Sequence, residues 1–320
     1  MALFRIVIPC IVLLFIACQP SAEKAIPSPR SGFALVYNEM DKSVLLFGGS
    51  DSTNTLLGDT WKWDIKSGWT QIEVKGPSPR ADAQFSYDSI RDEVVIFGGR
   101  TSDGRTKETW VWDGNSWALA DTTGPLERQL GAMAFDKSTN NVVLFGGSGQ
   151  GRARLNDTWL WDGTTWTEMK PDSIPSARGA HLMAFNNNSG RVALIGGYSN
   201  IMESDHWEWD GSNWILIDDK STPPRLHGSL AFNSELNALM IFGGFSAEQR
   251  EQDVWIYDGN QWVDQSAPGP EVRAEHEGVY LPDVGFFSFG GIIGQDMATS
   301  ERVKTNESWI FTNSTWTKVE

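Results

Sequence analysis

The stretch Val142-Val143-Leu144-Phe145-Gly146-Gly147, followed by Trp159-Leu160-Trp161-Asp162-Gly163 and then by Trp166, decides the fold of this chain of 320 residues. The same arrangement of an apolar run, a glycine pair, an aromatic step and a further aromatic residue occurs six times. The glycine pairs are Gly48-Gly49, Gly98-Gly99, Gly146-Gly147, Gly196-Gly197, Gly243-Gly244 and Gly290-Gly291. A period of about 47–50 residues predicts an array of small supersecondary units, because none of them could bury its apolar faces alone.

Two further spacings are constant, and the six copies serve as their own alignment. An arginine precedes the first glycine of each pair by 18 residues in five copies and by 17 in the sixth. The tryptophan that opens the aromatic step precedes the closing tryptophan of the same copy by 7 residues in five copies and by 8 in the first. The six arginines are Arg30, Arg80, Arg128, Arg178, Arg225 and Arg273.

Each copy reads as four strands, a to d. Strand a runs from the arginine to an aromatic residue (178–185, for example), and strand b is apolar throughout, as expected for a strand with both faces buried. Strand c places two aromatic residues on one face, and an Asp-Gly turn closes a c–d hairpin. All 16 tryptophans fall in these hairpins. The sequence therefore predicts an all-β, six-bladed propeller of four-stranded blades, closed by packing of the first blade against the last.

The glycine pair, the aromatic-Asp step and the following tryptophan are similar to the kelch repeat, over residues 28–320. The tyrosine usual at the aromatic-Asp step is tryptophan in four copies, and the last copy has Phe311-Thr312. The resemblance implies a binding surface at the channel mouth on the face that carries the b–c and d–a loops. It assigns to that mouth the arginine that opens strand a and the residue after each glycine pair. Carried over by position, the candidates are the six arginines above with Ser50, Arg100, Ser148, Tyr198, Phe245 and Ile292.

A ring of guanidinium groups suits carboxylates or other anionic ligands. In a chain with 41 acidic residues the alternative is that these arginines pair with loop carboxylates and hold the blades together. His181 and His276 fall early in strand a, near the same mouth, and join the candidate binding residues. The sixth b–c loop, between Gly291 and Trp309, is longer than the others, and this marks it as a second candidate site or as a tolerated insertion.

Several activities find no support in the sequence. The four histidines have no metal-ligand spacing, and no nucleophile elbow, P-loop or dinucleotide fingerprint occurs, so no metal or cofactor is expected. Galactose oxidase shares the kelch resemblance, but its copper radical site needs a cysteine cross-linked to a tyrosine, and the only cysteines here are Cys10 and Cys18. A net charge of −15 without a basic block argues against nucleic acid as a partner.

The N-terminus resembles the signal of a bacterial lipoprotein. Residues 6–17 are apolar apart from Pro9 and too short to span a bilayer, and Phe15-Ile16-Ala17-Cys18 resembles a lipobox. We therefore expect a signal peptide over 1–17, lipidation of Cys18, a linker over 18–27 and the propeller over 28–320, in the cell envelope on its extracytoplasmic side. The alternatives are an ordinary signal peptide with a chance cysteine, or an uncleaved anchor.

These patterns predict a lipid-anchored propeller that binds a protein or a glycan. The alternative is an enzyme similar to the kelch sugar-acid mutarotases of the bacterial periplasm, with Glu275 or His276 as proton carrier. A purely structural envelope protein is the third possibility. Fold alone does not choose between these functions.

Overall fold

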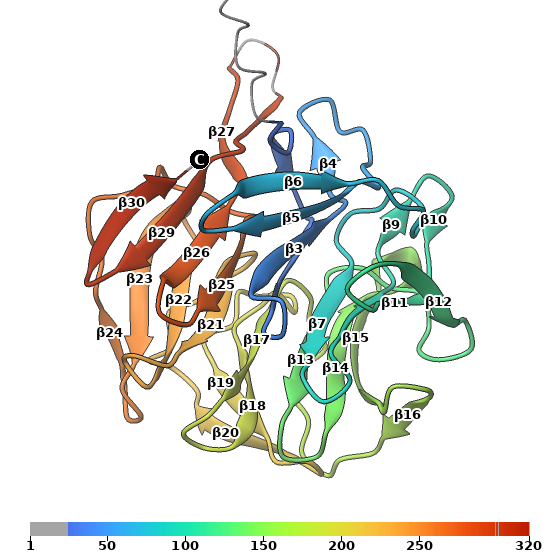
Figure 1. Cartoon of the computed structure of the whole chain (residues 1–320). Helices are drawn as coiled ribbons and strands as arrows, with labels where there is room; N and C mark the ends of the chain where they lie inside the picture. Colours follow the sequence, from blue (N-terminus) through green and yellow to red (C-terminus); the bar gives the residue numbers. More distant parts are fainter. Residues whose placement is uncertain (1–24, 298, 300, 320) are drawn as a thin grey trace, which may run out of the picture.

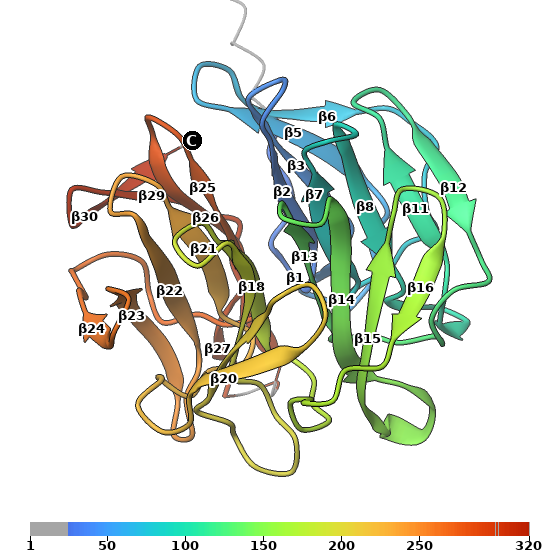
Figure 2. The same ribbon diagram turned by 90° about the horizontal axis from the view of Figure 1, so that it is seen from below.

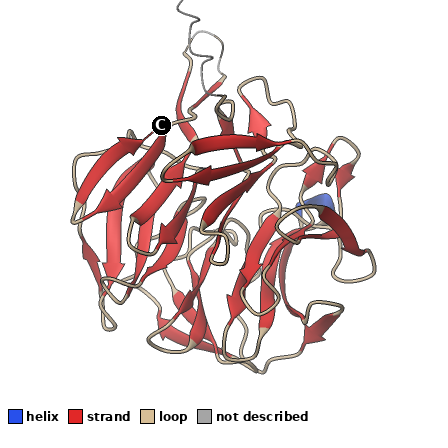
Figure 3. Ribbon diagram, in the orientation of Figure 1, coloured by secondary structure: helices blue, strands red, loops and turns tan. Residues whose placement is uncertain are grey.

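The computed structural model describes residues 25–297, 299 and 301–319, and in them six four-stranded antiparallel sheets surround a central axis (Figure 1). Strands and loops form nearly all of this structure, together with one short 3-10 turn, η1 (Gln150–Arg152) (Figure 3). Within the described residues there is no helix of the length and apolarity that a membrane span requires. The predicted signal peptide and Cys18 lie outside the described residues.

Each of the first three blades is a meander in which chain order equals sheet order. Blade 1 comprises β2 (Ala34–Asn38), β3 (Ser43–Phe47), β5 (Thr60–Asp64) and β6 (Gly68–Ile72). Blade 2 comprises β7 (Gln84–Asp88), β8 (Glu93–Phe97), β11 (Thr109–Trp112) and β12 (Trp117–Asp121). Blade 3 comprises β13 (Ala132–Asp136), β14 (Asn141–Ser148), β15 (Arg154–Trp161) and β16 (Trp166–Met169).

The other three blades repeat this order, and Figure 2 shows the same sheets from a second direction. Blade 4 comprises β17 (Leu182–Asn186), β18 (Arg191–Ile195), β19 (His206–Trp209) and β20 (Trp214–Asp218). Blade 5 comprises β21 (Ser229–Asn233), β22 (Ala238–Phe245), β23 (Arg250–Tyr257) and β24 (Trp262–Asp264). Blade 6 comprises β25 (Glu277–Leu281), β26 (Gly285–Phe289), β29 (Ser308–Thr312) and β30 (Thr315–Val319).

Three two-stranded ladders lie on the face that carries the b–c loops. They pair β1 (Arg30–Ser31) with β4 (Ser50–Asp51), β9 (Arg100–Thr101) with β10 (Gly104–Arg105), and β27 (Ile292–Gln295) with β28 (Arg302–Lys304). The enlarged sixth loop is thus a hairpin. The predicted propeller of six four-stranded blades is confirmed, with one change in the bounds of strand a. In blade 4 this strand begins at Leu182 rather than at Arg178, because Ala180 has a left-handed backbone (φ 58°) that interrupts an extended strand.

Six apolar clusters form the core, one at each contact between neighbouring blades. The second strand of each blade is buried on both faces, as the sequence predicts. The tryptophans of the c–d hairpins fill the space between sheets, and Trp161 and Trp209 are completely buried. The indole Nε1 of Trp117 donates to Thr60 Oγ1 of the preceding blade at 3.0 Å, and Trp214 donates likewise to Thr158.

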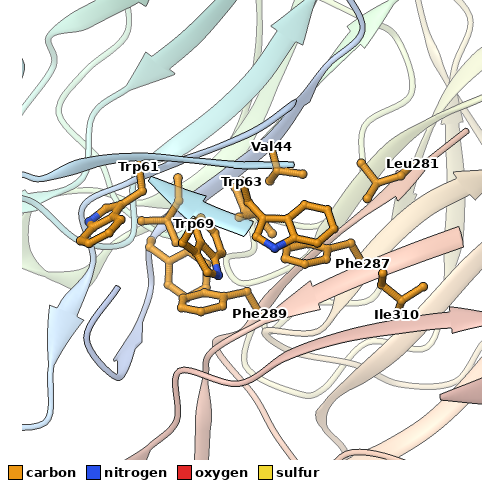
Figure 4. Close-up of a cluster of buried hydrophobic side chains, with 11 residues drawn as sticks. Val44, Trp61, Trp63, Trp69, Leu281, Phe287, Phe289 and Ile310 are labelled. Carbon is orange, nitrogen blue, oxygen red and sulfur yellow. The ribbon is translucent and has the colours of Figure 1, made fainter. Parts of the chain in front are cut away.

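The seam between blades 1 and 6 has the same tryptophan-to-hydroxyl hydrogen bond as three other blade junctions. Trp69 donates to Ser308 Oγ at 3.0 Å, and the rings of Trp63 and Phe287 lie 4.2 Å apart between centroids (Figure 4). The prediction that the ring closes by packing, without strand exchange, is confirmed. Lys304 on β28 adds three hydrogen bonds across the seam, to Ser50 O, Ser50 Oγ and Asp51 O at 2.8–3.0 Å.

The glycine pairs let neighbouring blades approach backbone to backbone. The N–H of Gly49 donates to the carbonyl of Arg80 in the next blade at 2.8 Å, and a Cβ on Gly48 would lie 2.7 Å from that same oxygen. Both glycines have positive φ, which other residues adopt only with strain. The equivalent hydrogen bond recurs at all six junctions, the last running from Gly291 to the carbonyl of Arg30.

The six arginines lie inside this joint, not at the channel mouth, so their assignment as ligand-binding residues is wrong. Each is at most 4% exposed. In five of the six blades, every one except blade 5, the arginine donates to the carbonyl of its own blade's first glycine, which explains the constant 18-residue spacing (17 in blade 6). Each also pairs with a carboxylate in its own blade. These ion pairs are Arg30–Asp59, Arg80–Glu108, Arg128–Asp157, Arg178–Asp205, Arg225–Asp253 and Arg273–Glu307.

The carboxylate of each pair also accepts the indole N–H of the tryptophan two residues later. Asp157 accepts from Trp159 at 2.7 Å, and Asp205 accepts from Trp207 at 2.8 Å. The arginine, glycine pair and first tryptophan of each repeat therefore belong to one hydrogen-bonded unit. The arginines thus follow the second of the two alternatives given by the sequence, in which they pair with carboxylates and hold the blades together.

Replacing Arg178 by alanine should lower the free energy of unfolding by about 3–5 kcal/mol, because it leaves Asp205 without its buried counter-ion. Lys170→Ala is the matched control. It removes an exposed ion pair with Glu168, and should cost no more than about 1 kcal/mol. Urea unfolding followed by tryptophan fluorescence measures both, and equal losses would contradict the role of the buried arginine.

Candidate functional site

A closed ring of six backbone hydrogen bonds surrounds the axis at the loop-rich face. Each member lies two residues after a buried arginine, and its N–H donates to the carbonyl of the equivalent residue in the preceding blade at 2.7–3.2 Å. All six have a φ between 53° and 63°. We call this the axial ring; its members are Gly32, Asp82, Leu130, Ala180, His227 and Glu275.

Two carboxylates of the axial ring flank Gly32. Without a side chain, Gly32 leaves room for Asp82, whose Oδ1 lies 2.5 Å from where a Cβ would stand. Glu275 accepts from Ser31 Oγ at 3.0 Å and from Arg302 at 2.8 Å. Burial raises the pKa of Asp82, and the neighbouring Glu275 raises it further. Burial opposes ionisation of Glu275 too, but its basic neighbours and Ser31 bring its pKa below the usual value.

Basic side chains gather at the same mouth from a position that our sequence analysis missed. This position lies five residues before the tryptophan that opens strand c, and it pairs across the b–c loop with the residue after the glycine pair in all six blades. Its occupants are Leu56, Arg105, Arg154, Met202, Arg250 and Lys304. Four of the six are basic, and the fixed spacing to the tryptophan is a signal that the sequence alone contained.

The three arginines at this position have no carboxylate partner among the described residues, and we call them the mouth arginines: Arg105, Arg154 and Arg250. Arg154 stacks on Tyr198, with 5.5 Å from the guanidinium carbon to the ring centroid. Arg250 stacks on Phe245 at 5.1 Å. The Nε atoms of Arg105 and Arg250 are buried and have no hydrogen-bond acceptor in the described part of the chain. Tyr198 and Phe245 thus hold two guanidinium groups that form no ion pair with any described residue.

The remaining cations at the mouth are engaged. Arg302 binds Glu275, Lys304 binds blade 1 across the seam, and Arg100 Nε lies 3.7 Å from Asp82 Oδ2. The predicted candidates Arg100 and Tyr198 are therefore at the mouth, where the sequence analysis put them. The mouth arginines can bind anions, and the carboxylates of the axial ring can accept hydrogen bonds.

His181 and His276 are not at the mouth, and their assignment as ligand-binding residues is corrected. They are at most 4% exposed and pack against Phe145 and Phe242, with ring centroids 5.5 and 5.0 Å apart. Burial lowers the pKa of each to about 3, with a smaller contribution from the arginine three residues earlier. His276 therefore stays neutral and out of reach, and Glu275 is held by Arg302. Neither Glu275 nor His276 is positioned to act as the proton carrier that the mutarotase alternative requires.

The axis itself is hollow. A channel of about 650 Å³ is lined by the innermost strand of every blade, from the axial ring to the opposite face. No group of three or more His, Cys, Asp or Glu side chains within the described residues is arranged to hold a metal ion.

The buried histidines make stability depend on pH. Their folded-state pKa values lie below the unfolded value of about 6.5, so the unfolded chain binds more protons and stability falls as the pH drops from about 6.5 toward 3. Phe33 occupies the matching position in blade 1. His181→Phe should therefore fold, and between pH 6.5 and 5 it should lose about 2 kcal/mol less than the wild type. Unfolding curves at several pH values measure this, and parallel losses in both proteins would contradict it.

Residues 16–125 match the family model of the KLHDC2/KLHL20/DRC7 Kelch-repeats domain. A stretch of 101 residues is 35% identical to tRNA wybutosine-synthesizing protein 4 of Aspergillus fumigatus, covering 29% of this chain and 10% of that protein. A stretch of 113 residues is 34% identical to the dynein alpha chain of the flagellar outer arm of Chlamydomonas reinhardtii, covering 32% of this chain and 2% of that protein.

The chain thus corresponds to a small part of each of these two much longer relatives. The family match spans blades 1 and 2, and the other four blades repeat the same glycine pair, arginine and tryptophan positions in the same structure. This chain is a six-bladed β-propeller whose first two blades match the kelch-repeat family model.

Proposed function

We propose that this propeller is a protein-binding module that holds an acidic segment of its partner at the loop-rich mouth. Kelch propellers are common protein-binding modules, which supports the general class. The observation that carries the specific proposal is the set of mouth arginines. In a chain with 41 acidic and 26 basic residues, unpaired arginines are unexpected unless a ligand neutralises them.

The chemistry of the mouth favours a carboxylate ligand. A guanidinium group binds a carboxylate through two parallel hydrogen bonds, and such pairs are stronger than neutral hydrogen bonds. The aromatic faces of Tyr198 and Phe245 hold two of the guanidinium groups and reduce the entropy lost on binding. A glycan ligand has no comparable support, because the tryptophans that could stack on sugars take part in blade packing.

Removing a mouth arginine should weaken binding without weakening the fold. For a hexaglutamate peptide as probe, Arg154→Ala and Arg250→Ala should each reduce affinity about 10- to 100-fold, as expected for the loss of a charge-assisted pair of about 1.5–3 kcal/mol. Lys137→Ala, at the opposite end of the channel, is the control and should bind as the wild type does. Affinity should also fall with salt.

Isothermal titration calorimetry gives the affinities, and thermal melts of the same variants check the fold. Unchanged affinity in both arginine variants would show that the mouth arginines do not bind acidic segments. Early melting of the variants with unchanged affinity would show that these arginines belong to the scaffold, like Arg178.

The lipid anchor at Cys18 is a second part of the proposal, and its support is the lipobox-like sequence. The chain enters the propeller at the loop-rich face, where Asn306 donates to the carbonyl of Pro27 at 3.2 Å. A tether over 18–27 reaches at most about 35 Å. An anchored propeller would therefore hold its loop-rich mouth near the membrane, and its partner would lie there too.

Cys18→Ser should release the protein from the membrane fraction, because the acyl chains attach to that thiol. Membrane fractionation measures the release, and intact mass of the wild type should show the lipid. Cys10→Ser is the control, since the predicted cleavage removes Cys10. Membrane association that persists in the Cys18 variant would contradict the anchor.

A further inference from the structure

The end of the channel opposite the axial ring is lined by aromatic residues, one per blade, seven residues after each buried arginine. The tyrosines belong to the adjacent blades 6, 1 and 2, and the phenylalanines to blades 3, 4 and 5. We call this set the aromatic collar; it comprises Tyr37, Tyr87, Phe135, Phe185, Phe232 and Tyr280.

Between the aromatic collar and the axial ring the channel wall is largely apolar and built from small side chains. Val36, Ala134, Ala184, Ala231 and Val279 each lie one residue before a collar residue and line the channel. Blade 2 contributes the polar residues Gln84 and Ser86 to this wall. The small apolar side chains of the other blades accommodate an aliphatic chain and offer a polar group no hydrogen bonds.

Glu277 is a carboxylate on an inner strand of the channel wall, between the axial ring and the aromatic collar. It begins β25 and lines the channel, with no hydrogen bond or ion pair to any described residue. The strands packed against β25 are β2, β21 and β26, and none of them carries a charged side chain. Tyr37 and Tyr280 are the other titratable groups on these four strands. Burial raises the pKa of Glu277 well above the usual value, and no neighbouring cation opposes this effect.

The lysines that line the channel, Lys42 and Lys137, lie in the a–b turns at its collar end, and no cation lies on the strands around Glu277. Glu277 is partly exposed to the channel, and a carboxylate among apolar groups is stable as an anion only when a cation accompanies it. Glu277 lies three residues from Tyr280, or roughly 10 Å along the strand. A cation that reaches Glu277 from the collar side must cross the apolar wall, so it needs an apolar stem behind it. Aromatic faces at the entrance attract cations rather than anions.

We propose that the channel is a binding site for an aliphatic primary amine, which enters through the aromatic collar and places its ammonium group at Glu277. The aliphatic stem lies against the small apolar side chains, and the ammonium donates hydrogen bonds to the carboxylate. This site lies in the channel interior, apart from the mouth arginines, and selects the opposite charge.

Binding of the amine releases a proton from the protein. The ammonium stabilises the ionised form of Glu277, so the carboxylic acid gives up its proton to the buffer when the complex forms. The number of protons released, up to one per bound amine, is measurable because the observed heat of binding then varies with the ionisation heat of the buffer. A purely apolar ligand causes no such release.

Glu277→Gln is the decisive variant, and the chain offers evidence that it will fold. Gln84 occupies the matching position in blade 2, four residues after its own buried arginine, and is 1% exposed. The probes are hexylammonium and, as its neutral analogue, 1-hexanol. Arg154→Ala serves as a control because it alters the mouth and leaves the channel intact.

For the wild type at pH 7 we expect hexylammonium to bind at least about tenfold more tightly than hexanol, with proton release in paired buffers. Glu277→Gln should lose this preference and the proton release while keeping its melting temperature, and Arg154→Ala should keep both. The proposal is overturned if hexylammonium does not bind the wild type, if hexanol binds equally well, or if the Gln variant binds hexylammonium unchanged. A Gln variant that fails to fold is replaced by Tyr280→Leu, which should weaken hexylammonium binding more than hexanol binding; equal weakening would also overturn the proposal.

Discussion

The structure depends on one buried joint, the arginine that fixes each glycine pair. Its guanidinium group donates to the first glycine of its own blade in five of the six blades, and its carbonyl accepts from the second glycine of the preceding blade in all six. A buried guanidinium is tolerated only because a carboxylate and a carbonyl surround it. The aspartate or glutamate of this pair in turn orients the first tryptophan of the hairpin. Blade geometry and blade-to-blade packing are thus set by the same few groups.

The arginine, carboxylate and glycine groups of this joint are bound to one another. Ligand binding therefore falls to the residues around the joint. The axial ring follows from the joint, since two residues after each arginine the chain must turn with a left-handed backbone toward the axis. The side chains on that ring vary from glycine to glutamate, and the loops beside it vary in length and charge. A rigid scaffold with variable loops at one end is a common basis for binding sites.

The repeats made the fold predictable to the level of single strands. Apolar runs, glycine pairs and tryptophan spacing each report a local requirement, and six copies repeat it.

The buried role of the arginines was only one of two alternatives, because a spacing of 18 residues does not reveal whether the side chain turns inward or outward. His181 and His276 were misplaced for a similar reason: a position early in strand a can face the mouth or the neighbouring blade. Arg105, Arg154 and Arg250 had a constant spacing to the tryptophan, but their lack of partners is visible only once the surrounding carboxylates are located. Glu277 could likewise not be singled out from the sequence, because only the fold shows that the strands around it carry no charged side chain.

The central functional claim is that a partner's acidic segment docks at the loop-rich mouth. Amide hydrogen exchange followed by mass spectrometry, with and without the hexaglutamate peptide, locates the contact directly. We expect slower exchange in the b–c loops around residues 100–106, 153–157 and 246–252, with the a–b turns of the opposite face unchanged. Protection confined to those a–b turns, or to the outer strands of the blades, would contradict it.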